Sequence, residues 1–165
     1  MANILFALAS LTLGAAAIIG YGAAGDAVLR ALLWPHAKIT EAFYHISLYY
    51  RHGVGYVAAG NGFTIGPACM GIHFIVMLFC LMVCVFIRRF RGFRKLAFFL
   101  SSLVGSVVVG VATSCVRIVG SISFLSSGQF TALHAGMGIA LYMAALVGIY
   151  FLINRATGGF YETHR

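Results

Sequence analysis

Four long apolar stretches set the limits on what this chain can fold into. They cover residues from about 3 to 20, 67 to 87, 96 to 119 and 131 to 153. Each is long enough to cross roughly 30 Å of hydrocarbon as a helix that rises about 1.5 Å per residue. Inside a bilayer every backbone group needs an internal hydrogen bond, which a helix supplies. The sequence therefore predicts an all-α integral membrane protein with about four transmembrane helices, forming one multi-pass domain over residues 1–165.

The composition agrees with this class. Hydrophobic residues make up 62% of the chain and charged residues 8%, whereas soluble domains carry about 25% charged residues. The net charge of +8 comes largely from one loop between the second and third stretches, which holds five of the eleven basic residues: Arg88, Arg89, Arg91, Arg94 and Lys95. A basic loop beside apolar spans is a topology signal. We therefore expect membrane lipids, and no nucleic acid, as partners.

The basic loop also orients the chain. The positive-inside rule places it in the cytoplasm. The start of the second span, the end of the third and the start of the fourth then share the outer face. Residues 1–20 have a second interpretation as a cleaved signal peptide, because small residues from Ala15 to Ala17 follow an apolar run, but this run begins without Lys or Arg.

The segment 21–65 carries too many charges for a simple span. Its apolar residues recur at three-, four- and seven-residue intervals, which predicts an amphipathic outer helix that breaks near Pro35. These residues are Val28, Leu32, Ile39, Phe43, Ile46 and Tyr50. A short fifth span is the alternative. Two β-prone runs then flank Gly60-Asn61-Gly62 within 54–65, which predicts a short β-hairpin.

Cys69 is the first candidate for chemistry. It lies at the boundary between this polar segment and the second span, and Pro67 suits the first position of a helix. We expect Cys69 in the first helical turn, where unpaired N–H groups and the helix dipole favour a thiolate. Cys80 and Cys84 lie deep in the span and form no Cys-x-x-Cys pair. The cysteine spacings also fit no zinc site, so no metal is expected.

The topology brings two further residues to the level of Cys69. Arg117 ends the third span and His134 begins the fourth, and an arginine at the edge of an apolar span usually faces protein or water. A thiolate, an imidazole and a fixed cation are the groups that acyl transfer needs: nucleophile, general acid/base and oxyanion or substrate stabiliser. His73, four residues after Cys69, is the alternative base or a substrate contact. Each residue alone also has a structural interpretation, as a packed thiol, a snorkelling cation or a helix cap.

At these residues the chain resembles the exosortase/archaeosortase family, multi-pass membrane enzymes that process proteins with short C-terminal sorting signals. The family has a Cys-Ser-Gly-like motif, an Asn-x-x-Arg motif and a His followed by Gly four residues later, in that order. The resemblance covers roughly residues 27 to 153, and the small size is similar to the compact exosortase K type. Two residues depart from the pattern: Met70 replaces Ser and Ser114 replaces Asn. The matching residues are Cys69 with Gly71, Arg117 with Ile118, and His134 with Gly138.

The resemblance implies a cysteine peptidase and transpeptidase that cuts a C-terminal sorting signal through a thioester on Cys69. Its substrates are proteins ending in a short motif, an apolar helix and a basic tail. The chemistry requires no cofactor, and the topology places the active site on the outer face of the membrane, which for this family is the bacterial cytoplasmic membrane. We expect substrate contacts from residues near the catalytic ones: His73, Met70, Gly71 and Ser114. The alternatives are a membrane thiol oxidoreductase, and a non-enzymatic transporter or assembly subunit in which Arg117 is a counter-ion.

Overall fold

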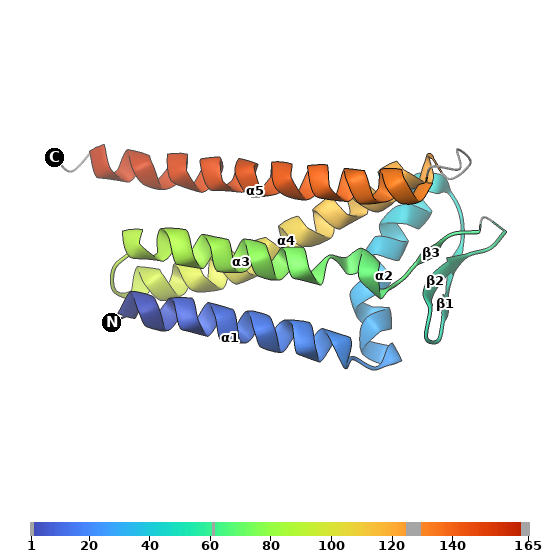
Figure 1. Cartoon of the computed structure of the whole chain (residues 1–165), viewed down its shortest axis with the longest axis horizontal. Coiled ribbons are helices and arrows are strands. Elements are labelled where there is room, and N and C mark those ends of the chain that lie inside the picture. The colour runs from blue at the N-terminus through green and yellow to red at the C-terminus, as the bar shows by residue number, and fades with distance from the viewer. Residues whose placement is uncertain (1, 61, 125–129, 163–165) are drawn as a thin grey trace.

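The computed structural model describes residues 2–60, 62–124 and 130–162. Within these residues, four helical segments are long and apolar enough to cross a membrane. They are α1 (Ala2–Gly22), α3 (Ile72–Phe86) with its flanking 3-10 turns η1 (Pro67–Met70) and η2 (Ile87–Arg89), α4 (Phe93–Ile122) and α5 (Phe130–Glu162). The four helices run along the long axis of the molecule (Figure 1). The predicted architecture of a multi-pass, mainly α-helical membrane protein is confirmed.

The two ends of the bundle differ. The start of α1, the end of α5 and the connection between α3 and α4 lie at one end, whereas the small sheet lies at the other (Figure 1). The basic connection is tied to its neighbours: Arg89 donates to the Asn154 amide oxygen at 2.8 Å, and Lys95 donates to that of Asn3 at 2.6 Å. All basic residues of this loop are therefore remote from the sheet.

Helix α2 (Asp26–Tyr44) lies across the sheet end of the bundle (Figure 1). Its far end is fixed to α4, because the Tyr44 hydroxyl donates to the Val119 carbonyl at 2.5 Å. The amphipathic helix is confirmed, but the break near Pro35 is wrong, since the helix continues through that residue. Burial of one face outweighs the hydrogen bond that a proline removes. The buried residues are Leu33, His36, Ala37 and Thr40.

A three-stranded antiparallel sheet follows, in the order β1 (Leu48–Arg51), β2 (Gly55–Ala58) and β3 (Thr64–Ile65). The β2–β3 pair is the predicted hairpin, with Tyr56 opposite Ile65. Asn61, at its turn, lies outside the described residues. The prediction of helix at Ile46 and Tyr50 is wrong, because α2 ends at Tyr44 and β1 pairs with β2. Tyr50 suits a half-buried strand as well as a helix face, so periodicity alone did not separate them.

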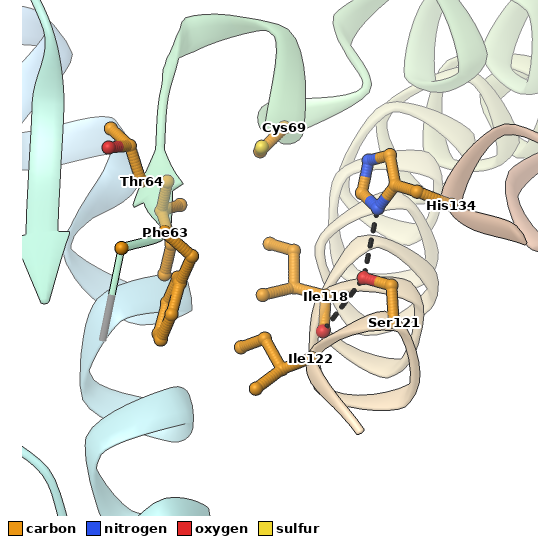
Figure 2. Close-up of a pocket in the computed structure, with 9 residues that line it drawn as sticks. Phe63, Thr64, Cys69, Ile118, Ser121, Ile122 and His134 are labelled. Carbon is orange, nitrogen blue, oxygen red and sulfur yellow. Dashed lines mark hydrogen bonds between the residues drawn. The ribbon is translucent and has the colours of Figure 1, made fainter. Parts of the chain in front are cut away.

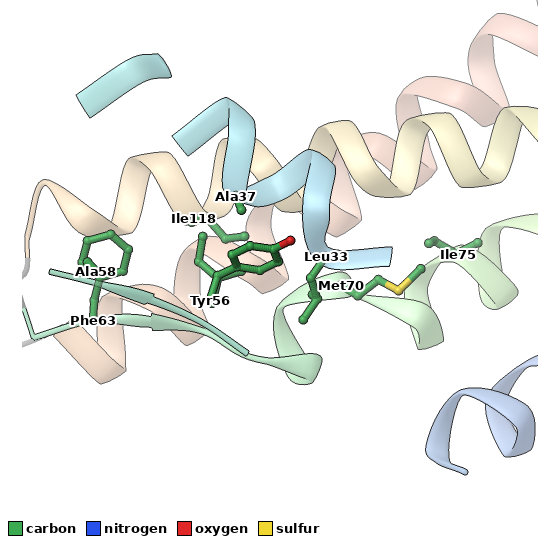
Figure 3. Close-up of a cluster of buried hydrophobic side chains, with 9 residues drawn as sticks. Leu33, Ala37, Tyr56, Ala58, Phe63, Met70, Ile75 and Ile118 are labelled. Atoms are coloured by element: carbon green, nitrogen blue, oxygen red, sulfur yellow. The ribbon is translucent and has the colours of Figure 1, made fainter. Parts of the chain in front are cut away.

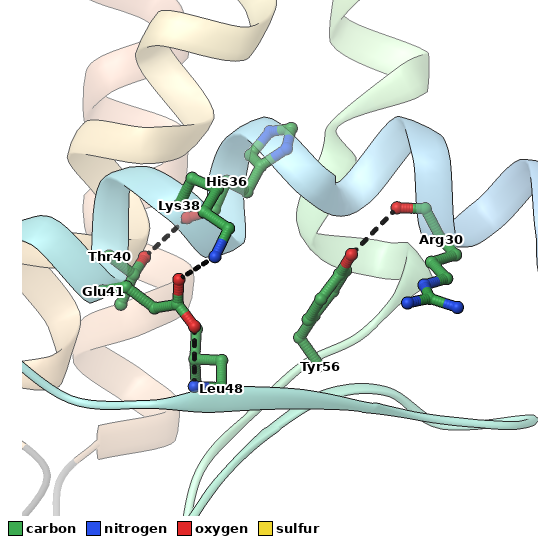
Figure 4. Close-up of polar contacts among 7 residues, drawn as sticks. All are labelled: Arg30, His36, Lys38, Thr40, Glu41, Leu48 and Tyr56. Atoms are coloured by element: carbon green, nitrogen blue, oxygen red, sulfur yellow. Dashed lines mark hydrogen bonds and ion pairs between the residues drawn. The ribbon is translucent and has the colours of Figure 1, made fainter.

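Several hydrogen bonds hold the sheet against α2, among them the bond from the Tyr50 hydroxyl to the Asp26 carboxylate at 2.9 Å and two that Figure 4 shows. The Glu41 carboxylate accepts a hydrogen bond from the backbone N–H of Leu48 at 2.8 Å and forms an ion pair with Lys38 at 2.6 Å. The Tyr56 hydroxyl donates to the Arg30 carbonyl at 3.3 Å. These contacts fix the edge strand β1 and the central strand β2 onto the helix.

The main hydrophobic core lies where α2, the sheet, η1, α3 and α4 meet (Figure 3). It therefore joins α2 and the sheet to the bundle and surrounds the turn that carries Cys69. A second cluster, around Phe74 and Leu78, packs α3 against α5. The residues of the main core are Leu33, Ala37, Tyr56, Ala58, Phe63, Ile65, Met70, Ile75 and Ile118.

Candidate active site

Cys69 lies in the four-residue 3-10 turn η1, not in the first turn of α3. Gly71 separates the two elements: it has φ +69° and serves both as the C-cap of η1 and as the N-cap of α3. A positive φ of this kind favours glycine, which has no Cβ to clash. The prediction that Cys69 lies in the first turn of the spanning helix is therefore wrong, because Gly71 interrupts the helix between Cys69 and α3.

The Cys69 turn is held by side chains from two membrane helices. The Tyr21 hydroxyl of α1 donates to the Pro67 carbonyl at 2.6 Å. From α4, Arg117 Nη2 donates to the Cys69 carbonyl at 3.2 Å and the Ser114 hydroxyl donates to the Met70 carbonyl at 3.2 Å. Three of the four carbonyls of η1 thus have side-chain donors. A short 3-10 turn has few internal hydrogen bonds, so these donors fix its conformation.

Neighbouring side chains also leave no room for a Cβ at Gly71. A Cβ at this position would lie 2.6 Å from the Tyr142 hydroxyl and 2.8 Å from Ser114 Oγ. These two hydroxyls are themselves 3.3 Å apart. Gly71 therefore lets α4 and α5 approach the end of the Cys69 turn.

Arg117 is half-buried between α4 and α5. Its guanidinium carbon lies 5.3 Å from the centre of the Tyr142 ring, a cation–π distance. A Cβ at Gly138 would lie 3.1 Å from Arg117 Cδ. The glycine four residues after His134 therefore makes room for the arginine on the neighbouring helix, which gives a physical reason for that spacing.

A pocket of about 200 Å³ opens beside the Cys69 turn. Figure 2 shows the Cys69 sulfur and the His134 imidazole at its edge, between β3 and α4. The pocket thus brings together the predicted nucleophile and the predicted base, which are 65 positions apart in sequence. It is lined by Gly62, Phe63, Thr64, Ile65, Cys69, Ile118, Ser121, Ile122 and His134.

The imidazole of His134 is oriented by Ser121. The Ser121 hydroxyl lies 3.0 Å from the Ile118 carbonyl, which accepts its single proton, and 2.9 Å from His134 Nδ1. Because a hydroxyl donates only once, Nδ1 carries a proton and donates it to Ser121 Oγ. Nε2 is then the basic nitrogen, and it lies on the side of the ring toward Cys69 (Figure 2).

The predicted substrate contacts divide into two groups. Met70 and Ser114 are buried, and together with Gly71 they form the packing junction behind Cys69 rather than the pocket lining. His73 is exposed on α3 and is also absent from the described lining. The expectation that His73 shares a helical face with Cys69 is wrong, because Gly71 interrupts the helix between them.

Another histidine, His36 of α2, is completely buried. Burial is the largest cause that lowers the pKa of its imidazole, and the positive charge of Arg117 lowers this pKa further. The Leu32 carbonyl acts in the opposite direction and raises it. His36 is therefore neutral at pH 7. Its position near a catalytic candidate could not be read from its spacing in the sequence.

The other cysteines lie away from the pocket. Cys80 Sγ donates to the Ser10 carbonyl at 3.6 Å in the α1–α3 contact, Cys84 is exposed on α3 and Cys115 is buried in α4. Within the described ranges, no three His, Cys, Asp or Glu side chains gather in a way that could hold a metal ion. The described pocket lining contains one thiol and one imidazole.

Three residues of this site were missed at the level of sequence: Tyr21, Ser121 and Tyr142. A tyrosine or serine inside an apolar helix is compatible with many roles, so its type gives little signal. The hydropathy pattern places Tyr21 and Ser121 at the same end of their spans as Cys69, and this was the one signal that could have suggested these two residues. Comparisons with protein-family models, with curated proteins and with solved structures found no match to this chain.

Proposed function

We propose that this chain is a membrane-embedded cysteine peptidase and transpeptidase that cleaves C-terminal sorting signals of exported proteins. The observation that carries the proposal is the pocket shared by Cys69 and His134. A thiol with a nearby oriented imidazole is the minimum pair for nucleophilic acyl transfer. Ser121 orients the imidazole, as the third group of such sites does.

The reaction follows from the pair. His134 Nε2 takes the proton of the Cys69 thiol, and the sulfur attacks the carbonyl carbon of the scissile peptide bond. The tetrahedral intermediate collapses, the C–N bond breaks and His134 returns the proton to the leaving amine. The product is a thioester on Cys69. Water or an amine then attacks the thioester, with His134 as base, and restores the thiol.

Arg117 has two roles in the proposal. It donates to the Cys69 carbonyl, which holds the nucleophile in place. The guanidinium lies behind Cys69, outside the described pocket lining. It has five N–H donors in a planar fork, so in the proposal a further donor reaches the oxyanion or the substrate backbone when a peptide is bound at Cys69. The ring of Tyr142 on one side and Gly138 on the other set its orientation.

The fold is compatible with action at the outer face of the bacterial cytoplasmic membrane. The connection between α3 and α4, which carries the basic residues, and the small sheet lie at opposite ends of the bundle (Figure 1). The pocket is at the sheet end, because Thr64 and Ile65 of β3 line it. The positive-inside rule assigns the loop to the cytoplasm, and hence the pocket to the outside. A substrate whose apolar helix crosses the bilayer would present the residues just before that helix at the level of Cys69. Its basic tail would remain in the cytoplasm.

The experiment is co-expression with a protein encoded by a neighbouring gene that ends in a short motif, an apolar helix and a basic tail. We expect the chain to shorten that protein, and Cys69→Ala to leave the precursor intact. Cys84→Ala, which removes an exposed thiol from the same span, is the matched control and should process normally. Unchanged processing by Cys69→Ala would refute the nucleophile.

A further inference from the structure

The small sheet has a free edge beside Cys69, and its role in substrate binding rests on the proposed function. In the order β1-β2-β3, strand β3 pairs with β2 on one side only. Figure 2 shows β3 with the pocket on its other side. Thr64 and Ile65, the two residues of β3, both line that pocket. The edge of the sheet and the candidate nucleophile therefore share one cavity.

The register shows which backbone groups face the pocket. The Ala58 N–H donates to the Phe63 carbonyl at 3.2 Å, and Tyr56 lies opposite Ile65. Backbone groups in an antiparallel pair alternate, so Phe63 and Ile65 turn theirs toward β2 while Thr64 turns its N–H and C=O outward. Among the described residues, no hydrogen bond to either of these Thr64 groups is found. Gly66 continues the extended backbone, with φ −92° and ψ 178°.

The opposite edge of the same sheet is treated differently. There the outward N–H of Leu48 donates a hydrogen bond of 2.8 Å to the Glu41 carboxylate. Exposed edges are normally blunted by charges or covered, because they pair readily with other strands. The N–H of Leu48 on the β1 edge thus has a partner, whereas among the described residues the N–H of Thr64 on the β3 edge beside Cys69 has none.

We propose that the substrate binds as an added β-strand on β3, with the Thr64 N–H and C=O bonding its backbone and Cys69 reaching its scissile carbonyl. Extended peptides commonly bind at free sheet edges in this way. The facing wall is apolar, with Ile118 and Ile122 of α4. No acidic, lysine or arginine side chain occurs in the described lining. The segment at the cleavage site is therefore extended and carries uncharged side chains.

The probe is a tripeptide chloromethyl ketone, acetyl-Ala-Val-Ala-CH2Cl, applied to the full chain in detergent. Cys69 sulfur displaces chloride, a thioether forms, and the thiol proton passes to His134 or solvent. Intact mass and peptide mapping give the labelling rate of Cys69. Iodoacetamide, which has no peptide backbone to pair with β3, serves as the reference reagent for thiol reactivity.

Two changes test the strand pairing. Thr64→Pro removes the outward N–H, and N-methylation of the probe's amides removes the matching donors. We expect each change to slow labelling by the probe at least tenfold, while the iodoacetamide rate stays within twofold. Equal rates for the methylated and unmethylated probes would overturn the proposal, even if Thr64→Pro fails to fold. Labelling reports binding at Cys69 without turnover, so a failure of the processing assay would be a separate result.

Discussion

The guanidinium of Arg117 donates a hydrogen bond of 3.2 Å to the backbone carbonyl of Cys69. This bond joins the third span to the turn that carries the candidate nucleophile, across 48 positions of sequence. The arginine therefore acts on the position of the nucleophile as well as on charge. Its contribution to the site should depend on the planar guanidinium and not only on its positive charge.

Replacing Arg117 with lysine tests that dependence. An ammonium on a flexible stem cannot reproduce both the bond to the Cys69 carbonyl and the placement over the Tyr142 ring. A hydrogen bond from a charged group contributes about 1.5–3 kcal/mol, so we expect processing to slow by roughly 10- to 100-fold. Densitometry of precursor and product in the co-expression assay measures it. Full processing by Arg117→Lys would reduce the residue to a structural cation.

Gly71→Ala should displace the Cys69 turn. The φ of +69° costs a residue with a Cβ about 1–2 kcal/mol, and that Cβ would also meet the hydroxyls of Tyr142 and Ser114. We expect lower thermal stability in detergent and faster hydrogen exchange over residues 66–71. Gly136→Ala is the matched control, because a Cβ there has open space. A Gly71→Ala protein with unchanged exchange would contradict the packing described.

Ser121→Ala should slow processing without unfolding the protein. The change removes the acceptor for His134 Nδ1–H, and a neutral hydrogen bond contributes about 0.5–1.5 kcal/mol. The expected loss is roughly three- to tenfold in rate. Ser121→Thr retains a hydroxyl and should restore most of the rate. If Ser121→Ala and Ser121→Thr behave alike, the hydroxyl does not orient the imidazole.

Acidification should destabilise the contact of α2 with the bundle. The folded-state pKa of His36 is lowered, chiefly by burial, so its contribution to stability is complete above the unfolded pKa of about 6.5 and declines as pH falls below it. Melting temperatures in detergent between pH 7.5 and 5 measure the effect. His36→Phe, which fills the same buried space without a titrating group, should flatten this part of the curve. An equally steep curve in the variant would assign the pH dependence elsewhere.

A second acid transition is expected at lower pH. Hydrogen bonds lower the pKa of Asp26, first through the Gly53 N–H, and that of Glu41, first through Lys38. Stability from such carboxylates is present above their unfolded pKa of about 4 and is lost below it. Asp26 and Glu41 both bond the sheet segment, at Tyr50 and Gly53 and at Leu48, so limited proteolysis of residues 45–66 should accelerate at this lower pH. Asp26→Asn should show the same susceptibility already at neutral pH.

Much of the architecture could be predicted because hydropathy depends on many residues at once. The four spans, the helix α2 and the β2–β3 hairpin each follow from a pattern over ten or more positions. Strand β1 was missed because Tyr50 and Ile46 fit a helical stripe equally well. Four residues of β1 carry too little periodicity to decide between the two structures.

For the site, the sequence could predict only the depth of each residue along its membrane span. Of the three residues assigned to the same depth, Cys69 and His134 line the pocket, whereas Arg117 is absent from its described lining and contacts the Cys69 carbonyl instead. The depth gave no information on rotation about each helix, so Ser121 and Tyr142 were missed. The assignment of His73 to the face of Cys69 failed on one backbone angle, the positive φ of Gly71. A single glycine conformation is not visible in a hydrophobic pattern.

The central claim is that Cys69 and His134 act as one pair, and the rate of Cys69 alkylation by iodoacetamide between pH 6 and 9 tests it most directly. Peptide mapping resolves Cys69 from Cys84, which serves as an internal reference in the same molecule. The account predicts that wild-type Cys69 reacts faster than Cys84 at pH 7, and that His134→Ala slows Cys69 about tenfold without changing Cys84. An unchanged Cys69 rate in His134→Ala across the whole pH range would contradict the account.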